Sequence, residues 1–220
     1  MENDVLHHSV IRTGPIMKLL HIDSSISGQN SVTRGLTRKI VERQKAANPG
    51  LEVEYLDLAL QAPAPLSLDA LGFRLPPSDE ALTDIQRREN ELSEALVAQL
   101  IAADVVVIGS PLYNFTVPAQ LKAWLDRVAQ AGRTFKYTES GPVGLLGGKT
   151  VILALSRGGV YSTSDAGNAM EHQESYLKTI FGFMGVTDIR VVRAEGMDMG
   201  PESRERGLAQ AQEAILALAA

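Results

Sequence analysis

Two aromatic side chains and an amide stand together in Pro111-Leu112-Tyr113-Asn114-Phe115, directly after the apolar residues 105–108. A short β-branched run predicts a buried strand, and Pro111, which has no N–H to donate, predicts its end. Flat aromatic faces, an amide and the free N–H groups of a loop can hold a planar heteroaromatic ring by its face and its edge. The residues alone leave open the alternative of a plain turn whose aromatics belong to the core.

A second polar loop precedes the first helical pattern and contains Ser25, Asn30, Ser31 and Thr33. Backbone N–H groups at the start of a helix bind anions, and hydroxyl groups add donors. The Gly-x-Gly-x-x-Gly and Gly-x-x-x-x-Gly-Lys patterns are absent, so a single terminal phosphate fits this loop better than a dinucleotide or a nucleoside triphosphate. A simple helix cap by Asn30 or Ser31 is the alternative reading of the same residues.

A third loop, Ser156-Arg157-Gly158-Gly159, follows another apolar run. Paired glycines let the backbone approach the edge of a ligand, and the Ser156 hydroxyl can donate or accept a hydrogen bond. We expect the Arg157 side chain to pair with a surface carboxylate and the backbone around it to approach a phosphate. An ordinary Gly-Gly turn is the alternative.

Composition excludes several other chemistries. The chain has no cysteine, which removes disulfides, thiolate nucleophiles and Cys-type metal sites. Its four histidines lack ligand spacing, so we expect no metal site. Gly109-Ser110-Pro111 is not a Gly-x-Ser-x-Gly nucleophile elbow, and we expect no catalytic side chain. A net charge of −5 without a basic stripe argues against nucleic acid as a partner, and no apolar stretch is long enough to span a membrane.

Strand and helix patterns alternate along the chain. Apolar runs predict strands at residues 19–23, 52–58, 105–109, 150–155 and 188–194, and periodic segments predict helices at 31–48, 83–103, 118–131, 169–184 and 201–219. We expect the connections 59–79 and 133–148 to be irregular. This alternation predicts an α/β fold with a doubly wound five-stranded parallel sheet in the order 2-1-3-4-5 and helices on both faces. The three polar loops then meet at the carboxyl edge of the sheet.

The N-terminus stands apart from this pattern. Residues 1–16 are polar, include His7 and His8, and have no apolar core of a signal peptide. We therefore expect residues 1–16 to be a poorly ordered extension and residues 17–220 to form a single domain.

Several short motifs occur in register and together resemble a known family. They are Pro111-Leu-Tyr-Asn-Phe115, Gln120-Leu-Lys122, Phe135-Lys-Tyr-Thr-Glu139, Gly141-Pro142, Ser156-Arg-Gly-Gly159 and Phe181-Gly-Phe-Met-Gly185. From Met17 to the C-terminus the chain resembles the FMN-dependent NADH:quinone oxidoreductases, also called NADH-azoreductases. The resemblance implies a flavodoxin-like fold, one non-covalent FMN per subunit, NADH as electron donor, and a cytoplasmic homodimer with shared active sites.

The resemblance also implies roles for individual residues. The FMN phosphate would be bound by Ser25, Ser31, Val32 and Thr33. The isoalloxazine ring would be held by Pro111, Leu112, Tyr113, Asn114 and Phe115, and the site completed by Ser156, Arg157, Gly158 and Gly159. The substrate face would be lined by Tyr137, Tyr161 and Phe183. The chain departs from the family at Tyr161, where some relatives have His, and at Val32, where a polar residue is frequent.

The implied reaction is ping-pong, two-electron hydride transfer through N5 of FMN, with quinones and aromatic azo compounds as acceptors and amines as the azo products. The alternative functions are a one-electron carrier of the flavodoxin type and another NAD(P)H-dependent FMN reductase.

Overall fold

The computed structural model describes residues 16–74 and 82–218. Apart from Ile16, the N-terminal extension lies outside the described residues, so its expected disorder stays a prediction. Residues 75–79 of the long connection lie outside them as well.

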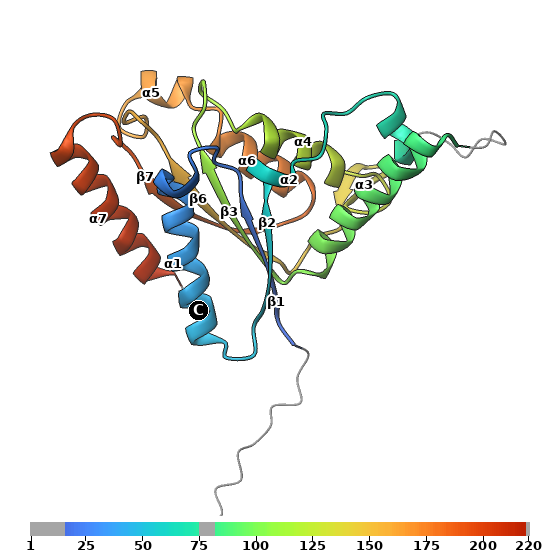
Figure 1. Cartoon of the computed structure of the whole chain (residues 1–220), viewed down its shortest axis with the longest axis horizontal. Coiled ribbons are helices and arrows are strands. Elements are labelled where there is room, and N and C mark those ends of the chain that lie inside the picture. Colours follow the sequence, from blue (N-terminus) through green and yellow to red (C-terminus); the bar gives the residue numbers. More distant parts are fainter. Residues whose placement is uncertain (1–15, 75–81, 219–220) are drawn as a thin grey trace, which may run out of the picture.

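The centre of the fold is a parallel sheet of five strands in the order β2-β1-β3-β6-β7. This is the predicted doubly wound order 2-1-3-4-5, with the strands renumbered because a small hairpin intervenes. The strands all run toward the top of Figure 1, where their carboxyl ends lie. Their bounds are β1 Lys18–Asp23, β2 Glu52–Asp57, β3 Val105–Pro111, β6 Thr150–Ser156 and β7 Asp188–Ala194. The two central strands β3 and β6 are almost wholly buried, as their continuous apolar runs predict.

Helices cover both faces of the sheet (Figure 1). One core lies under α1 and α7 and includes Leu36 and Ile215. The other lies under α3, α4 and α6 and includes Leu100, Trp124 and Phe181. The helices are α1 Val32–Ala47, α2 Leu58–Gln61, α3 Asp84–Ala102, α4 Ala119–Val128, α5 Asp165–Met170, α6 Glu174–Phe183 and α7 Pro201–Ala217, with 3₁₀ turns at Gly28–Asn30 and Asp69–Arg74.

Helix α1 packs directly on β3 because Gly109 has no side chain. A Cβ atom at Gly109 would lie 2.7 Å from Asp23 Oδ1 and 2.9 Å from Thr37 Cγ2. These contacts place the start of α1 close to the carboxyl end of β3. The first and second polar loops of the sequence are thereby brought side by side.

Two connections that we predicted to be irregular contain regular structure. The segment after β2 begins with α2 and later forms the 3₁₀ turn Asp69–Arg74. The segment 133–148 contains an antiparallel hairpin of β4 Phe135–Thr138 and β5 Gly141–Gly144. The hairpin was missed because its strands are short and rich in glycine and proline, and because contacts distant in sequence hold it: Leu146 donates its N–H to the Met184 carbonyl at 2.8 Å.

The predicted helix 169–184 is wrong, because two helices, α5 and α6, replace it. Glu171 has an extended backbone, with φ −92° and ψ 104°, which ends α5. Its carboxylate then accepts the N–H groups of Gln173 and Glu174, both at 2.6 Å, and so starts α6. Helix α4 ends at Val128 rather than at residue 131, because the Thr134 hydroxyl donates to the Val128 carbonyl at 2.8 Å.

Candidate functional site

An open cleft lies at the carboxyl edge of the sheet, where the loops after β1, β3, β6 and β7 meet. Most of the residues predicted to bind a cofactor line this cleft: Ser25, Ser31, Val32, Pro111, Leu112, Tyr113, Ser156, Arg157 and Gly158. The loops also contact one another directly. The Ser25 and Tyr113 hydroxyls are 3.5 Å apart, and Leu112 donates its N–H to the Ser156 carbonyl at 2.8 Å. The cleft is therefore one site shared by segments distant in sequence.

The start of α1 forms one end of the cleft. Ser31 caps the helix by accepting the Arg34 N–H at 3.3 Å, as the capping interpretation predicts. Among the described residues, the N–H groups of Val32 and Thr33 have no acceptor. Free amides at the positive end of a helix of this length favour an anion. Capping and anion binding are thus compatible here.

The Thr33 side chain does not reach the cleft. It is fully buried, because α1 packs on the sheet through this position, and its hydroxyl lies 3.1 Å from that of Ser31. Thr33 therefore offers a ligand its backbone N–H only.

The aromatic loop is a tight two-residue turn. Tyr113 and Thr116 exchange both backbone hydrogen bonds, at 2.9 and 3.1 Å, and Asn114 and Phe115 between them have positive φ values of 46° and 70°. This is the geometry of a type I′ turn, which strongly prefers Asn or Gly. Asn114 suits it, whereas Phe115 is a strained choice. The side chains of Asn114 and Phe115 are exposed, so the turn presents them outward rather than into the core, contrary to the core-turn alternative.

Replacing Phe115 with Gly should relieve this strain. A left-handed L-residue costs about 1–2 kcal/mol, so Phe115→Gly should raise the unfolding free energy of the flavin-free protein by up to about 1 kcal/mol. The loss of an aromatic face should weaken flavin binding about 3- to 10-fold. Urea unfolding and FMN titration measure the two effects. Asn114→Gly should give a smaller gain in stability, because Asn tolerates this conformation. A Phe115→Gly protein that is clearly less stable than the wild type would rule out strain at this turn.

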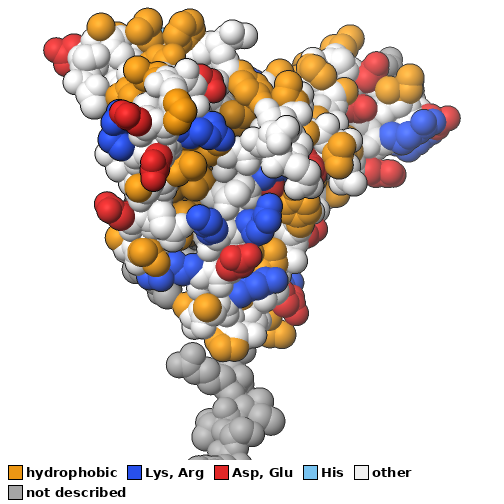
Figure 2. All heavy atoms as spheres, turned by 60° about the vertical axis from the view of Figure 1, so that its left-hand side comes forward, with side chains coloured by type: hydrophobic (Ala, Val, Ile, Leu, Met, Phe, Trp, Pro, Cys, Tyr) orange, Lys and Arg blue, Asp and Glu red, His pale blue; other side chains and the backbone are white. Residues whose placement is uncertain are grey.

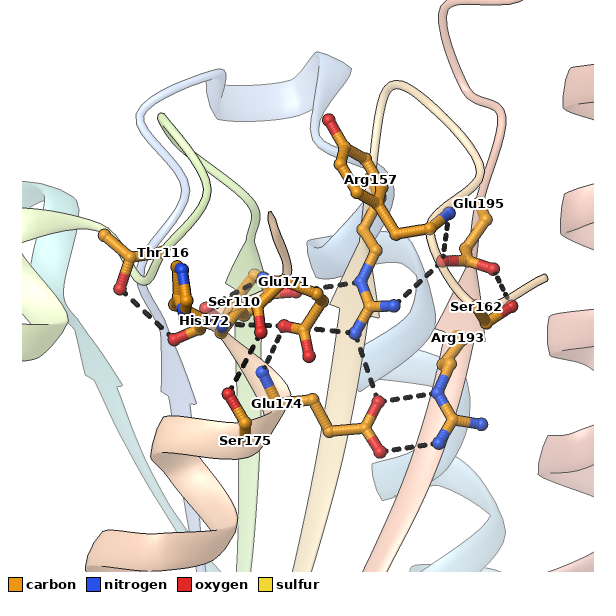
Figure 3. Close-up of polar contacts among 12 residues, drawn as sticks. Ser110, Thr116, Arg157, Ser162, Glu171, His172, Glu174, Ser175, Arg193 and Glu195 are labelled. Atoms are coloured by element: carbon orange, nitrogen blue, oxygen red, sulfur yellow. Dashed lines mark hydrogen bonds and ion pairs between the residues drawn. The ribbon is translucent and has the colours of Figure 1, made fainter. Parts of the chain in front are cut away.

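The Arg157 guanidinium lies among the carboxylates of three glutamates, which are largely buried (Figure 3). It lies 3.4 Å from Glu171, 3.1 Å from Glu174 and 2.8 Å from Glu195. The Arg157 side chain is 2% exposed, and the side chains of its three carboxylate partners are 10–11% exposed. We had predicted a surface carboxylate as the partner, and that part of the prediction is wrong. Pairing with carboxylates is confirmed, and each nitrogen of the Arg157 guanidinium has a partner within the protein.

The same cluster holds two of the cleft loops together. Arg157 Nε donates to Gln173 Oε1 at 3.3 Å, and Gln173 Nε2 donates to the Ser110 carbonyl at 2.7 Å. Next to it, His172 donates its N–H to the Phe115 carbonyl at 2.9 Å. The break between α5 and α6 therefore supports the aromatic turn and the loop after β6 at once.

Glu174 makes the stability of this cluster sensitive to acid. Burial alone would raise the pKa of Glu174, but hydrogen bonds from Arg193 and Lys178 outweigh it and lower that pKa to about 2. A carboxylate with a depressed pKa stabilises the fold above its ordinary pKa, and this contribution is lost as the pH falls. We expect the unfolding free energy to decrease between pH 5 and about pH 2. Urea unfolding across this range should give a shallower pH dependence for Glu174→Gln, and equal slopes would contradict the assignment.

The residues predicted to line the substrate face lie outside the cleft. Tyr137, on the hairpin, is 73% exposed, and its ring meets that of Phe135 edge to face. Phe183 packs on the same Phe135, with ring centroids 4.6 Å apart. Tyr161 instead meets Phe115 at 6.4 Å, above the aromatic turn. Asn114, Phe115 and Gly159 also do not line the cleft, but they border it.

Sequence reasoning missed part of the cleft lining. The additional residues are Ser27, Asn30, Met197, Asp198 and Arg204. Ser27 and Asn30 lie in a loop that had been identified, whereas the other three follow β7, a strand whose loop had drawn no attention. The predicted strand order places the loop after β7 at the same edge of the sheet as the other cleft loops, and this order could have indicated that it lines the cleft.

The fold and the cleft define a flavodoxin-like protein, and residues 17–219 match the family described as having the flavodoxin-like fold. The chain belongs, within this fold, to the family of FMN-dependent NADH:quinone oxidoreductases. It is 68% identical over 200 residues to a protein of that name from Polaromonas naphthalenivorans, covering 91% of this chain and 92% of the relative. It is 60% identical to one from Acidovorax ebreus, covering 90% and 92%.

Solved structures of azoreductases also resemble this chain in fold and sequence. An azoreductase from Bacillus anthracis strain Sterne is 32% identical and superposes with a TM-score of 0.83, covering 91% of this chain and 97% of that one. An FMN-dependent NADH-azoreductase from Bacillus anthracis strain Ames Ancestor, solved in complex with FMN, is 28% identical with a TM-score of 0.83, covering 93% and 100%. No helix within the described residues is long and apolar enough to cross a membrane. The same part of the chain holds no His, Cys, Asp and Glu group that could bind a metal ion.

Proposed function

We propose that this chain is an FMN-dependent NADH:quinone oxidoreductase that also cleaves aromatic azo compounds to amines. The observation that carries the proposal is the single cleft in which an anion-binding helix start, an aromatic turn and a glycine loop converge. Relatives that are 68% and 60% identical carry the quinone oxidoreductase name, and structures of similar fold are azoreductases.

The residues of the cleft fit FMN from end to end. The free amides of Val32 and Thr33 suit its phosphate. At the other end, the turn with Tyr113 offers an aromatic face for the ring system. Among the described residues, the N–H groups of Gly158 and Gly159 have no acceptor, so both are available to the edge of a ring.

Bound FMN supplies two-electron transfer from NADH to an acceptor, and the protein supplies position and electrostatics. The turn at Asn114 and Phe115 would orient the ring, and the two backbone hydrogen bonds between Tyr113 and Thr116 hold this turn in place. The N–H donors of Gly158 and Gly159 would favour negative charge on a ring edge placed against them. Phe115 and Tyr161, whose rings meet edge to face, would help to keep water from the bound ring. No side-chain nucleophile is needed.

We also propose that the chain works as a homodimer in which the second copy completes the substrate face. The proposal is supported by large apolar side chains exposed around the cleft and the hairpin: Phe115, Tyr137, Val143, Leu145 and Met170. Exposed apolar surface beside a ligand site is a common mark of an interface between subunits. A chain without cysteine has no disulfide that a reducing compartment could break, which agrees with the cytoplasmic location that we propose.

A test of the function begins with the purified full chain and its flavin absorbance. NADH oxidation is then followed with benzoquinone and with methyl red. We expect one NADH consumed per quinone and two per azo bond, because cleavage to two amines needs four electrons. A colourless protein that takes up no FMN would overturn the proposal. A stable one-electron form on reductive titration, without NADH turnover, would instead identify a flavodoxin-type carrier.

A further inference from the structure

Arg204 lies beside the anion-binding end of the cleft. Helices α1 and α7 run side by side in the same direction on one face of the sheet (Figure 1). Lys39 donates to Gln212 at 2.8 Å, and Arg43 further along α1 donates to the Leu216 carbonyl at 2.7 Å. Eight residues before Lys39 is Ser31, and eight residues before Gln212 is Arg204. This register brings Arg204 level with the first turn of α1. Ser31 and Arg204 both line the cleft.

The guanidinium of Arg204 has free donors. Its Nη1 donates to the Met197 carbonyl at 3.1 Å, which ties the side chain to the loop after β7. Among the described residues, Arg204 takes part in no ion pair, and Nε and Nη2 have no acceptor. Four of its five N–H groups are therefore available to a ligand.

The other arginines near the cleft are already occupied. Arg34 Nη1 and Nη2 both donate to the Asp57 carboxylate at 2.7 Å, and Nη2 also donates to the Ser25 carbonyl. Arg157 is paired with three carboxylates. Arg204 is thus the cation in the described cleft lining whose charge is not matched by a carboxylate. Basic and acidic side chains are interspersed over the face of the molecule drawn in Figure 2.

We propose that Arg204 binds the phosphate of FMN and makes the cleft selective for FMN over riboflavin. The inference rests on the proposed function. A phosphate dianion gains from charge-assisted hydrogen bonds to a guanidinium, which binds it through two donors at once. The amides of Val32 and Thr33 supply direction but only partial charge. The nearby carboxylate of Asp198, which lines the same cleft, increases the need for a full positive charge.

The test is Arg204→Met in the full chain, stripped of bound flavin and titrated with FMN and with riboflavin. Loss of a charged hydrogen bond to the phosphate should weaken FMN binding about 10- to 100-fold. Riboflavin, which has no phosphate, should bind the variant as it binds the wild type. Raising the salt concentration should weaken FMN binding less in the variant than in the wild type. Arg204→Lys should recover part of the FMN affinity, since it keeps the positive charge but not the paired N–H donors of the guanidinium.

Arg206→Met is the matched control, because it removes the same charge from the same helix but lines a different cleft. Its affinities for both flavins should match those of the wild type. Equal weakening of FMN and riboflavin by Arg204→Met, or no change in FMN binding, would overturn the role of Arg204. Wild-type protein that binds neither flavin would overturn the proposed function itself. Arg204 is exposed, so the Met variant should keep the wild-type melting temperature.

Discussion

Arg157→Met should destabilise the protein by about 3–5 kcal/mol, because it leaves buried carboxylates without their shared cation. Glu171, Glu174 and Glu195 all lie within 3.4 Å of the guanidinium, and their side chains are 10–11% exposed. Glu174 keeps its bonds to Arg193 and Lys178, so Glu171 and Glu195 bear most of the loss. Urea unfolding of the flavin-free protein measures the change.

A double variant distinguishes the cost of leaving a buried carboxylate unpaired from the cost of lost packing. Arg157→Met with Glu195→Gln should recover part of the stability, because the neutral amide needs no counter-charge and can still bond to Ser162. Lys122→Met is the surface control: its pair with Asp126 at 2.7 Å is partly exposed and should contribute no more than about 0.5 kcal/mol. If Arg157→Met cost no more than Lys122→Met, the carboxylate cluster would not stabilise the fold.

The consequences for the site follow from the geometry of the cluster. Arg157 and Gln173 connect the loop after β6 to the end of β3, where the aromatic turn begins. Loss of the guanidinium should therefore lower the flavin content of the purified protein as well as its stability. Added FMN should restore part of the stability, since a ligand that binds only the folded state raises the unfolding free energy.

The sheet could be predicted from sequence because its central strands are buried on both faces. Such strands need continuous apolar runs, and residues 105–108 and 151–155 have them. Each run is followed at once by a loop with a distinct composition, so strand order and ligand edge could be inferred together. The edge strand β2 is largely exposed and was found through its alternation instead.

Features held by contacts distant in sequence could not be predicted in the same way. The break at Glu171 depends on a carboxylate that faces Arg157 and on the Phe115 carbonyl that accepts the His172 N–H. Neither contact can be inferred from the local pattern of apolar residues that predicted one continuous helix. The carboxylate partners of Arg157 come from two distant segments, the junction of α5 and α6 and the loop after β7, so the sequence indicated pairing but not burial. Met197, in the loop after β7, and Arg204, near the start of α7, were missed for the same reason, because no local motif marks the residues that complete a cleft.

Gly158→Val should weaken FMN binding by about 1–3 kcal/mol, or roughly 5- to 150-fold, by filling space that the ligand needs. A Cβ atom at Gly158 would lie 2.6 Å from Asp198 Oδ2 and 3.4 Å from its Cγ. Asp198 is exposed and lines the same cleft, so its side chain can turn away, and the valine or the displaced carboxylate then occupies the cleft. The φ of Gly158 is not positive, so an L-residue fits the backbone, and the flavin-free variant should melt within about 2 °C of the wild type.

A second substitution distinguishes the two sources of crowding. Gly158→Ala places a single methyl group against Asp198, and adding Asp198→Gly removes the atoms that this methyl group meets. If the displaced carboxylate is the obstacle, the double variant should bind FMN more tightly than Gly158→Ala alone. If the added carbon itself fills the cleft, both proteins should bind equally weakly, and Gly158→Val more weakly still. FMN affinity equal to the wild type in Gly158→Val would show that the flavin does not lie against this loop, because no ligand in contact with Gly158 can be indifferent to three additional carbon atoms there.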